Sequence, residues 1–191
     1  MRRICLIQGH PSRDNHFCHA LAQAYMDGAR TAGHDVREIR VAELDFPLLR
    51  ERADWEGAPP PAIAAAQRDF DWAEHLVIVY PLWLGALPAL LKAFFEQLLR
   101  PGFAFQGKVG EATHLPLRGR SARTIVTMGM PGIVYRLWYR AHTLRAFERN
   151  VLRFVGIKPC RHSVVGQVEG LSELARAEWL GHLRSLGARA R

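Results

Sequence analysis

Residues 76–105 constrain the fold of this chain more than any other part of its sequence. They begin with an unbroken apolar run, residues 76–80, which has the length of a strand buried on both faces in a parallel sheet covered by helices. Pro81 is expected to end this strand, because proline has no N–H for a sheet ladder. After a turn through Gly85, residues 88–99 repeat at helical spacing. The segment therefore predicts a strand, a turn and a helix, which is half of a βαβ unit.

The rest of the chain repeats this order of strand and helix. Strands are expected over residues 3–8, 35–41, 122–128 and 160–168, and helices over residues 17–32, 62–74, 135–155 and 171–186. Residues 43–61 and 100–120 are rich in proline or glycine and are expected to be long connections. Strands that alternate with helices imply a doubly wound parallel sheet, and right-handed crossovers restrict its topology. We predict one α/β domain over residues 1–191, with a five-stranded flavodoxin-like sheet of order 2-1-3-4-5 and helices on both faces.

Composition excludes several other classes of protein. A chain of 191 residues that is 49% hydrophobic is long enough to bury a sizeable core and is typical of a globular protein. Its apolar runs are shorter than the ~18 residues of a membrane span, so no membrane insertion is expected. Strand-like sequence begins by Ile4, so no signal peptide is expected. Cys5, Cys18 and Cys160 form no C-x-x-C pair and no metal spacing, which predicts no metal site and a cytoplasmic protein.

The net charge of +8 raises the possibility of a nucleic-acid partner. The arginines are dispersed along the sequence, and no predicted helix carries a continuous basic stripe interleaved with aromatic residues. We therefore expect no nucleic-acid partner. The charge instead favours anions in general, such as an anionic cofactor or NADPH. The arginines within residues 184–191 are expected to belong to a solvated tail.

Three loops should meet where the strand order reverses, at the carboxyl ends of the strands. The first loop, residues 9–16, precedes a predicted helix whose free N–H groups and dipole favour an anion. It contains neither G-x-G-x-x-G nor the Walker pattern, so neither a Rossmann dinucleotide site nor a P-loop is indicated. Asn15 or His16 would equally suit a helix cap. Capping and phosphate binding use the same N–H groups, so both interpretations stay open for this loop alone.

The other two loops differ from the first in character. The loop after residues 76–80 is apolar, with Leu82, Trp83 and Leu84, and it suits a flat aromatic cofactor better than a phosphate. The loop at residues 127–132 combines a threonine with two glycines, whose backbone amides can approach a ligand closely, although alone it would be a plain turn. A phosphate grip, a flat apolar platform and a polar backbone rim together predict a flavin site.

These segments resemble the flavodoxin-like NAD(P)H:quinone oxidoreductases. This family includes NAD(P)H dehydrogenase (quinone) and the ancillary flavoproteins of potassium efflux systems. The resemblance covers about residues 3–168, and the segment around Pro81 is its most specific part. The motifs that carry it are G-H-P at residues 9–11, H-F-C-H-A-L at 16–21, YPLWLGALPALLKAFFEQLLRPGFAF at 80–105 and TMGMPGIVY at 127–135.

The resemblance implies a set of site residues. The first five would hold the flavin phosphates, the next four would underlie the isoalloxazine ring, and the last four would line its polar edge. In that order they are His10, Asn15, His16, Phe17, Cys18, Pro81, Leu82, Trp83, Leu84, Thr127, Met128, Gly129 and Met130. Tyr135 and His142 correspond to a catalytic pair that faces the flavin. They are seven residues apart, close to two helical turns, so one face of a single helix would present both.

The resemblance also implies an activity. It implies FAD, with FMN as the alternative, NAD(P)H as co-substrate, a quinone-like acceptor, and a homodimer. The helices after the third and fourth strands would form much of the dimer contact. A non-catalytic or regulatory flavoprotein subunit of a potassium efflux system is the alternative function.

Three positions depart from the family pattern. His16 stands where serine is frequent, Leu84 where a second tryptophan is frequent, and Met130 where a second glycine is frequent. These departures bear on the cofactor and substrate more than on the fold. The choice between NADH and NADPH stays open.

Overall fold

The structure is a computed structural model that describes residues 1–105 and 115–191. Its five strands form one parallel sheet of order β2-β1-β3-β4-β5. The predicted flavodoxin-like α/β order is therefore confirmed. The strands are β1 Arg3–Gln8, β2 Asp35–Arg40, β3 His75–Pro81, β4 Ser121–Thr127 and β5 Cys160–Val165.

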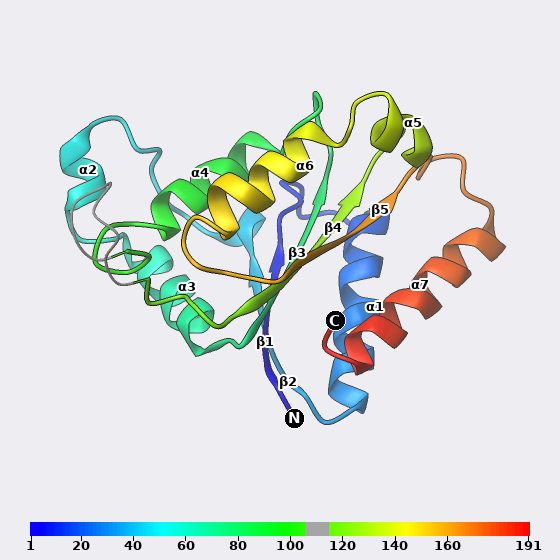
Figure 1. Ribbon diagram of the computed structural model, residues 1–191, viewed down its shortest axis with the longest axis horizontal. Coiled ribbons are helices and arrows are strands. Elements are labelled where there is room, and N and C mark those ends of the chain that lie inside the picture. Colours follow the sequence, from blue (N-terminus) through cyan, green and yellow to red (C-terminus); the bar gives the residue numbers. More distant parts are fainter. Residues whose placement is uncertain (106–114) are drawn as a thin grey trace.

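Helices cover both faces of this sheet. α1 and α7 lie side by side on one face, and α3, α4 and α6 pack on the other (Figure 1). Among the described residues, no helix has the length and apolar character that a membrane crossing requires. The helices are α1 Phe17–Thr31, α2 Arg52–Glu56, α3 Pro61–Trp72, α4 Ala89–Leu98, α5 Gly132–Leu137, α6 His142–Phe147 and α7 Glu173–Ala188, with short turns η1 Val41–Glu43 and η2 Glu148–Leu152.

The core follows from the alternation of side chains along the strands. Ile4 and Leu6 of β1 pack against α1 and α7, whereas Cys5 and Ile7 pack against the helices on the opposite face. Every residue of β3 is buried, because this central strand is covered on both faces. The continuous apolar run in the sequence is thus explained by its place in the middle of the sheet.

Two helical glycines allow α1 and α7 to pack closely. A Cβ added at Gly28 would collide with the carbonyl oxygen of Arg184, and one added at Gly187 would collide with that of Tyr25. The last turn of α7 and the residues after it are therefore held against α1, and Ala190 is only 3% exposed. The arginines of residues 184–191 are exposed, as expected, but the segment is not a free tail, because Leu186, Gly187 and Ala190 are buried.

The end of β3 lies one residue later than the sequence predicts. Pro81 is the last residue of the strand and pairs with Thr127 of β4. The Leu82 N–H donates to the Thr127 carbonyl of β4 at 2.7 Å. The nitrogen of Pro81 therefore faces the β1 side of the strand. Pairing of β3 with β1 has already ended at Val79. The missing N–H of proline therefore breaks no ladder hydrogen bond.

The segment expected to be largely helical over residues 135–155 is mostly helical, but it is broken into separate helices and is not one continuous helix. α5 ends at Leu137, and Arg140 and Ala141 adopt left-handed φ angles of 49° and 48°, which interrupt the helix before α6 starts at His142. Two further differences concern the long connections. The short helix α2 interrupts the connection expected over residues 43–61. Residues 106–114 of the connection expected over 100–120 lie outside the described residues.

Candidate functional site

A cavity of about 750 Å³ lies at the carboxyl ends of β1, β3 and β4, where the strand order reverses. It brings together all the predicted cofactor-binding residues except Leu84 and Met130. Its lining comes from the loops after β1, β3, β4 and β5 and from α7. The lining residues are His10, Ser12, Asp14, Asn15, His16, Phe17, Cys18, Pro81, Leu82, Trp83, Thr127, Met128, Gly129, Val168, Glu169 and Arg176.

His10 is held in one orientation by the loop after β1. Its backbone N–H donates to the side-chain oxygen of Gln8 at 3.1 Å, and its Nδ1 accepts from the Ser12 N–H at 3.1 Å. Because Nδ1 acts as an acceptor, the neutral ring carries its proton on Nε2. Gln8 also donates to the Cys18 carbonyl at 3.3 Å and ties this loop to α1. His10 therefore offers a fixed donor beside the start of a helix.

The start of α1 presents backbone donors next to this imidazole. The His16 N–H donates to Nδ1 of His19 at 3.2 Å, whereas the N–H groups of Phe17 and Cys18 donate to no acceptor among residues 1–105 and 115–191. The helix dipole adds partial positive charge at this end. Capping through His19 thus uses only part of the donor set, and the remaining N–H groups suit an anion.

Three imidazoles gather around these donors. The rings of His10 and His16 stack with centroids 4.1 Å apart, and His19 lies 5.2 Å from His10. Burial, followed by the charges of His16 and His19, lowers the pKa of His10 to about 4. Burial is also the main cause that lowers the pKa of His19. Among the described residues, no group of histidine, cysteine or carboxylate side chains is arranged to hold a metal ion.

The turn after β3 forms an apolar platform. Pro81, Leu82 and Trp83 line the cavity, and Trp83 stands edge-on to His10 with ring centroids 5.8 Å apart. Paired hydrogen bonds between Trp83 and Ala86 close the turn at 3.0 and 2.9 Å. Leu84 has a left-handed φ of 46° and a fully exposed side chain, so it does not line the cavity. Half of the Trp83 side chain also stays exposed.

The loop after β4 forms a rim of backbone. The Met128 N–H donates to the Val165 carbonyl at 2.9 Å, and the Met128 carbonyl accepts from the Val168 N–H at 3.2 Å. A Cβ added at Gly129 would meet only a carboxylate oxygen of Glu169, at 3.9 Å. The rim is therefore fixed by neighbouring strands and open toward the cavity at this glycine.

Sequence reasoning missed the residues that follow β5. Val168 and Glu169 line the cavity, as does Arg176 from the first turns of α7. The Arg176 guanidinium lies 4.8 Å from the Phe17 ring centroid and donates to the Val168 carbonyl at 2.6 Å. These residues belong to no readable motif. The sequence offered one signal for them. The predicted sheet order places the carboxyl end of β5 beside that of β4, next to the same cavity.

Tyr135 and His142 do not lie on one helix, because the chain is interrupted between α5 and α6. Neither residue lines the cavity. Tyr135 is buried, with its hydroxyl oxygen 3.2 Å from Oγ1 of Thr143, and Thr143 in turn donates to the Gly85 carbonyl. His142 is exposed. The hydrogen-bond partner of Tyr135 is therefore Thr143, which sequence reasoning did not single out.

Residues 2–186 match the family described as having a flavodoxin-like fold. NAD(P)H dehydrogenase [quinone] 1 of Rattus norvegicus is 24% identical, over 94% of this chain and 74% of that protein. An FMN-dependent NADH:quinone oxidoreductase of Nitratidesulfovibrio vulgaris is 30% identical, with 86% of each chain covered. The solved structure of an NAD(P)H:quinone oxidoreductase from Methanothermobacter marburgensis has a TM-score of 0.82 at 21% identity, over 98% of this chain and 96% of that chain.

Proposed function

Since this chain belongs to the flavodoxin-like fold family, as its motifs predicted, we propose that it is a flavin-dependent NAD(P)H oxidoreductase. In this proposal it reduces quinones or related acceptors by hydride transfer through a bound flavin. The observation that carries the proposal is one cavity that joins a helix N-terminus, an apolar platform and a backbone rim. The names of the relatives from Rattus norvegicus and Nitratidesulfovibrio vulgaris support the same chemistry.

The donor set of the cavity fits a flavin. The N–H groups of Phe17 and Cys18 and Nε2 of His10 would hold its phosphate. The platform, Pro81 to Trp83, would lie against the isoalloxazine ring, and the rim at Gly129 would face its polar edge. A volume of about 750 Å³ accommodates a ligand of this class. We propose FAD, with FMN as the alternative.

The protein would contribute binding and orientation, while the bound flavin would supply the hydride chemistry. Trp83 and Leu84 form an exposed apolar surface beside the cavity. Trp83 is 49% exposed, and Leu84 is fully exposed. We propose that NAD(P)H and the acceptor use this same open side in turn. Reduction of the acceptor would then begin only after the nicotinamide has left.

We propose that Tyr135 and His142 handle protons at this site from two different helices. The Tyr135 hydroxyl is linked through Thr143 to the carbonyl of Gly85, which belongs to the turn that carries the platform. This link fixes the phenol relative to the platform. His142 is exposed at the start of α6, so its imidazole would exchange protons with water.

We also propose that the protein is a homodimer. Phe94 and Phe95, which lie on the helix after β3, are buried in the protein's own core and cannot contribute contact area. Apolar side chains on and after α5 remain exposed, with Leu137 at 72% and Trp138 at 82%. A second copy would cover this face. A Trp138→Ala variant that weakens dimers in light scattering would support this contact, and a monomeric wild-type protein at micromolar concentration would contradict it.

The test of the proposed function is reconstitution. Purified protein would be mixed with FAD or FMN and desalted, and the mass of the retained flavin would be measured. Oxidation of NADH and of NADPH would then be followed with and without 1,4-benzoquinone. Retained flavin with quinone-dependent turnover is the expected result. Retained flavin without such turnover would favour the regulatory flavoprotein, and the absence of retained flavin would contradict both functions.

A further inference from the structure

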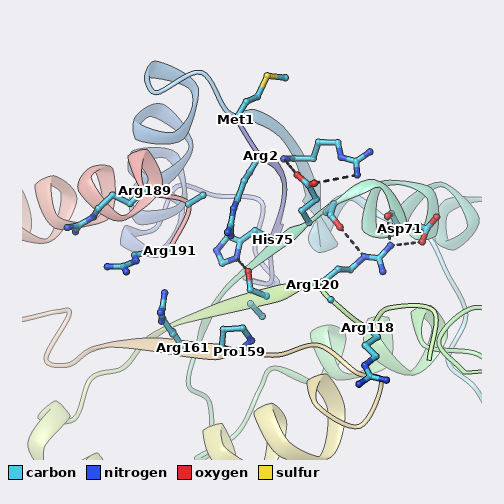
Figure 2. Close-up of a pocket in the computed structure, with 17 residues that line it drawn as sticks. Met1, Arg2, Asp71, His75, Arg118, Arg120, Pro159, Arg161, Arg189 and Arg191 are labelled. Atoms are coloured by element: carbon cyan, nitrogen blue, oxygen red, sulfur yellow. Dashed lines mark hydrogen bonds and ion pairs between the residues drawn. The ribbon is translucent and has the colours of Figure 1, made fainter. Parts of the chain in front are cut away.

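A second cavity, also of about 750 Å³, lies at the amino ends of the strands, on the sheet edge opposite the candidate flavin site. Figure 2 shows side chains from the starts of the strands and from the end of α7 gathered around His75. Among the described residues, its lining contains two acidic side chains, Asp71 and Glu74, against seven arginines. These are Arg2, Arg3, Arg118, Arg120, Arg161, Arg189 and Arg191.

Both carboxylates already have partners. Asp71 accepts from Arg120 at 2.8 Å, and Arg120 also donates to the carbonyl oxygens of Ala73 and Pro116. Glu74 lies 3.8 Å from Arg3. Within residues 1–105 and 115–191, these pairs leave no acidic side chain of the lining to offset the remaining arginines.

Arg2 and Arg161 are the arginines of the lining that directly precede or belong to a strand and have a free guanidinium among the described residues. Their guanidinium groups form no ion pair and no hydrogen bond with any part of the chain that the structure describes, and both residues are exposed. Arg2 precedes β1 and Arg161 lies in β5, so they approach from either side of β3 and β4, which run between those strands. A ligand between them would meet one cation on each side.

The base of the cavity adds an unsatisfied donor or acceptor. His75, the first residue of β3, is 2% exposed, and its Nδ1 shares a hydrogen bond of 2.8 Å with Oγ of Ser121. Its Nε2 has no partner among the described residues. Burial, and then the charges of Arg2, Arg123 and Arg161, lower the pKa of His75 to about 3. Three arginines thus act on this imidazole with no compensating anion.

Helix dipoles explain only part of this cluster. α1 and α7 both end at this edge, and arginines near helix C-termini offset the partial negative charge there. Arg189 fits this explanation, because its Nε donates to the Ser185 carbonyl of the last turn at 3.1 Å. Arg2 and Arg161 belong to the strand edge and have no helix carbonyl as a partner among the described residues, so their presence needs another explanation.

We propose that this cavity binds a small anion with two or more phosphate groups, held between Arg2 and Arg161 above His75. Guanidinium groups pair well with phosphate oxygens, and two separated cations favour a ligand that carries charge at both ends. Arg2 and Arg161 flank a concave site and do not form a stripe along one helix. The geometry therefore favours a compact polyphosphate over a nucleic-acid backbone.

The experiment is titration calorimetry with inorganic pyrophosphate on the full chain. Wild-type protein is compared with the double variant Arg2→Gln/Arg161→Gln and with Arg52→Gln. Arg52 is the matched control, because its side chain is 84% exposed on α2, away from the cavity (Figure 1). We expect the double variant to bind pyrophosphate at least about tenfold more weakly and the control to bind it like wild type.

A second readout follows the imidazole directly. In NMR titrations, pyrophosphate should raise the pKa of His75 in wild-type protein, because an anion opposes the charges of Arg2 and Arg161. The double variant should show no such ligand-dependent change. If ADP binds as tightly as pyrophosphate, the same site would accept the diphosphate group of a nucleotide, and the proposal would be supported. Equal pyrophosphate affinity in wild type and double variant, or binding of a single-stranded oligonucleotide without binding of pyrophosphate, would overturn the proposal.

Discussion

The two edges of one parallel sheet carry cavities of equal volume and opposite construction. At the carboxyl edge α1 begins, so its free N–H groups and dipole favour an anion, while burial lowers the pKa of the neighbouring His10 and His19. At the amino edge α1 and α7 end, and their carbonyls repel anions, so only guanidinium groups can make that edge attractive to phosphate. In our proposals, phosphate recognition relies on helix N–H groups and a largely buried imidazole at one edge, whereas at the other edge it relies on formal charge.

The largest effect that separates the two edges should come from blocking one of them. In Gly129→Val the added side chain would project toward Glu169, across the mouth of the carboxyl-edge cavity. Gly129 has no positive φ, and no backbone atom opposes its Cβ, so the fold should tolerate the change. We expect flavin affinity to fall at least about 100-fold, while pyrophosphate binding at the amino edge stays unchanged. Flavin absorbance after gel filtration measures the loss, and full retention of flavin would contradict the proposed cavity.

The next effect concerns catalysis at the carboxyl edge only. Tyr135→Phe and His142→Ala should retain full flavin content, because neither residue lines the cavity. Each should slow flavin reduction by NAD(P)H by at least about 10-fold, because an acid–base group is lost. Arg161→Gln is the control at the opposite edge and should leave the rate unchanged. Stopped-flow rates equal to wild type in both variants would remove the two residues from the mechanism and leave the flavin site intact.

The fold and most of the carboxyl-edge site were predictable because their signals are local. The apolar run at residues 76–80 can be satisfied only by a central strand, and the sheet order follows from alternating elements and crossover handedness. The loops that line the cavity follow directly from the ends of those strands. Leu84 was misplaced because its left-handed backbone turns the side chain away from the cavity, and leucine gives no sign of that conformation.

The amino-edge cluster was not predictable in the same way. Arg2, Arg161 and Arg189 are far apart in the sequence, so the arginines were read as dispersed. They meet because the starts of parallel strands lie at one edge and α7 returns to it. The break at Arg140 and Ala141 was missed for a related reason, since two left-handed residues other than glycine are set by tertiary packing and not by local propensity.

A smaller difference between the edges should appear with salt. Salt screens the attraction between exposed guanidinium groups and an anion. It weakens hydrogen bonds from buried backbone groups much less. From about 0.05 M to about 0.5 M salt, we expect pyrophosphate affinity at the amino edge to fall about fivefold. Flavin affinity at the carboxyl edge should change less than about twofold. Titrations of both ligands on one protein sample give the comparison, and equal salt slopes would show that the two edges do not differ as proposed.

The smallest effect concerns pH at the carboxyl edge. The pKa of His10 is lowered to about 4 without ligand, and a bound phosphate would raise it, since an anion stabilises the imidazolium. A group whose pKa rises on binding strengthens that binding as the pH falls toward the pKa of the bound state. The imidazoles of His16 and His19 and the carboxylates of Asp14 and Glu169 also face this position.

We therefore expect FAD affinity to increase about threefold from pH 7 to pH 5. FAD suits this measurement better than FMN, because its diphosphate bridge keeps its charge in this range. His10→Gln retains a side-chain N–H donor but does not titrate, so it should bind FAD with a flatter pH dependence. An affinity that falls with decreasing pH, or a slope unchanged by His10→Gln, would mean that His10 does not contact the phosphate. The carboxyl edge would then recognise its ligand through the backbone of α1 alone.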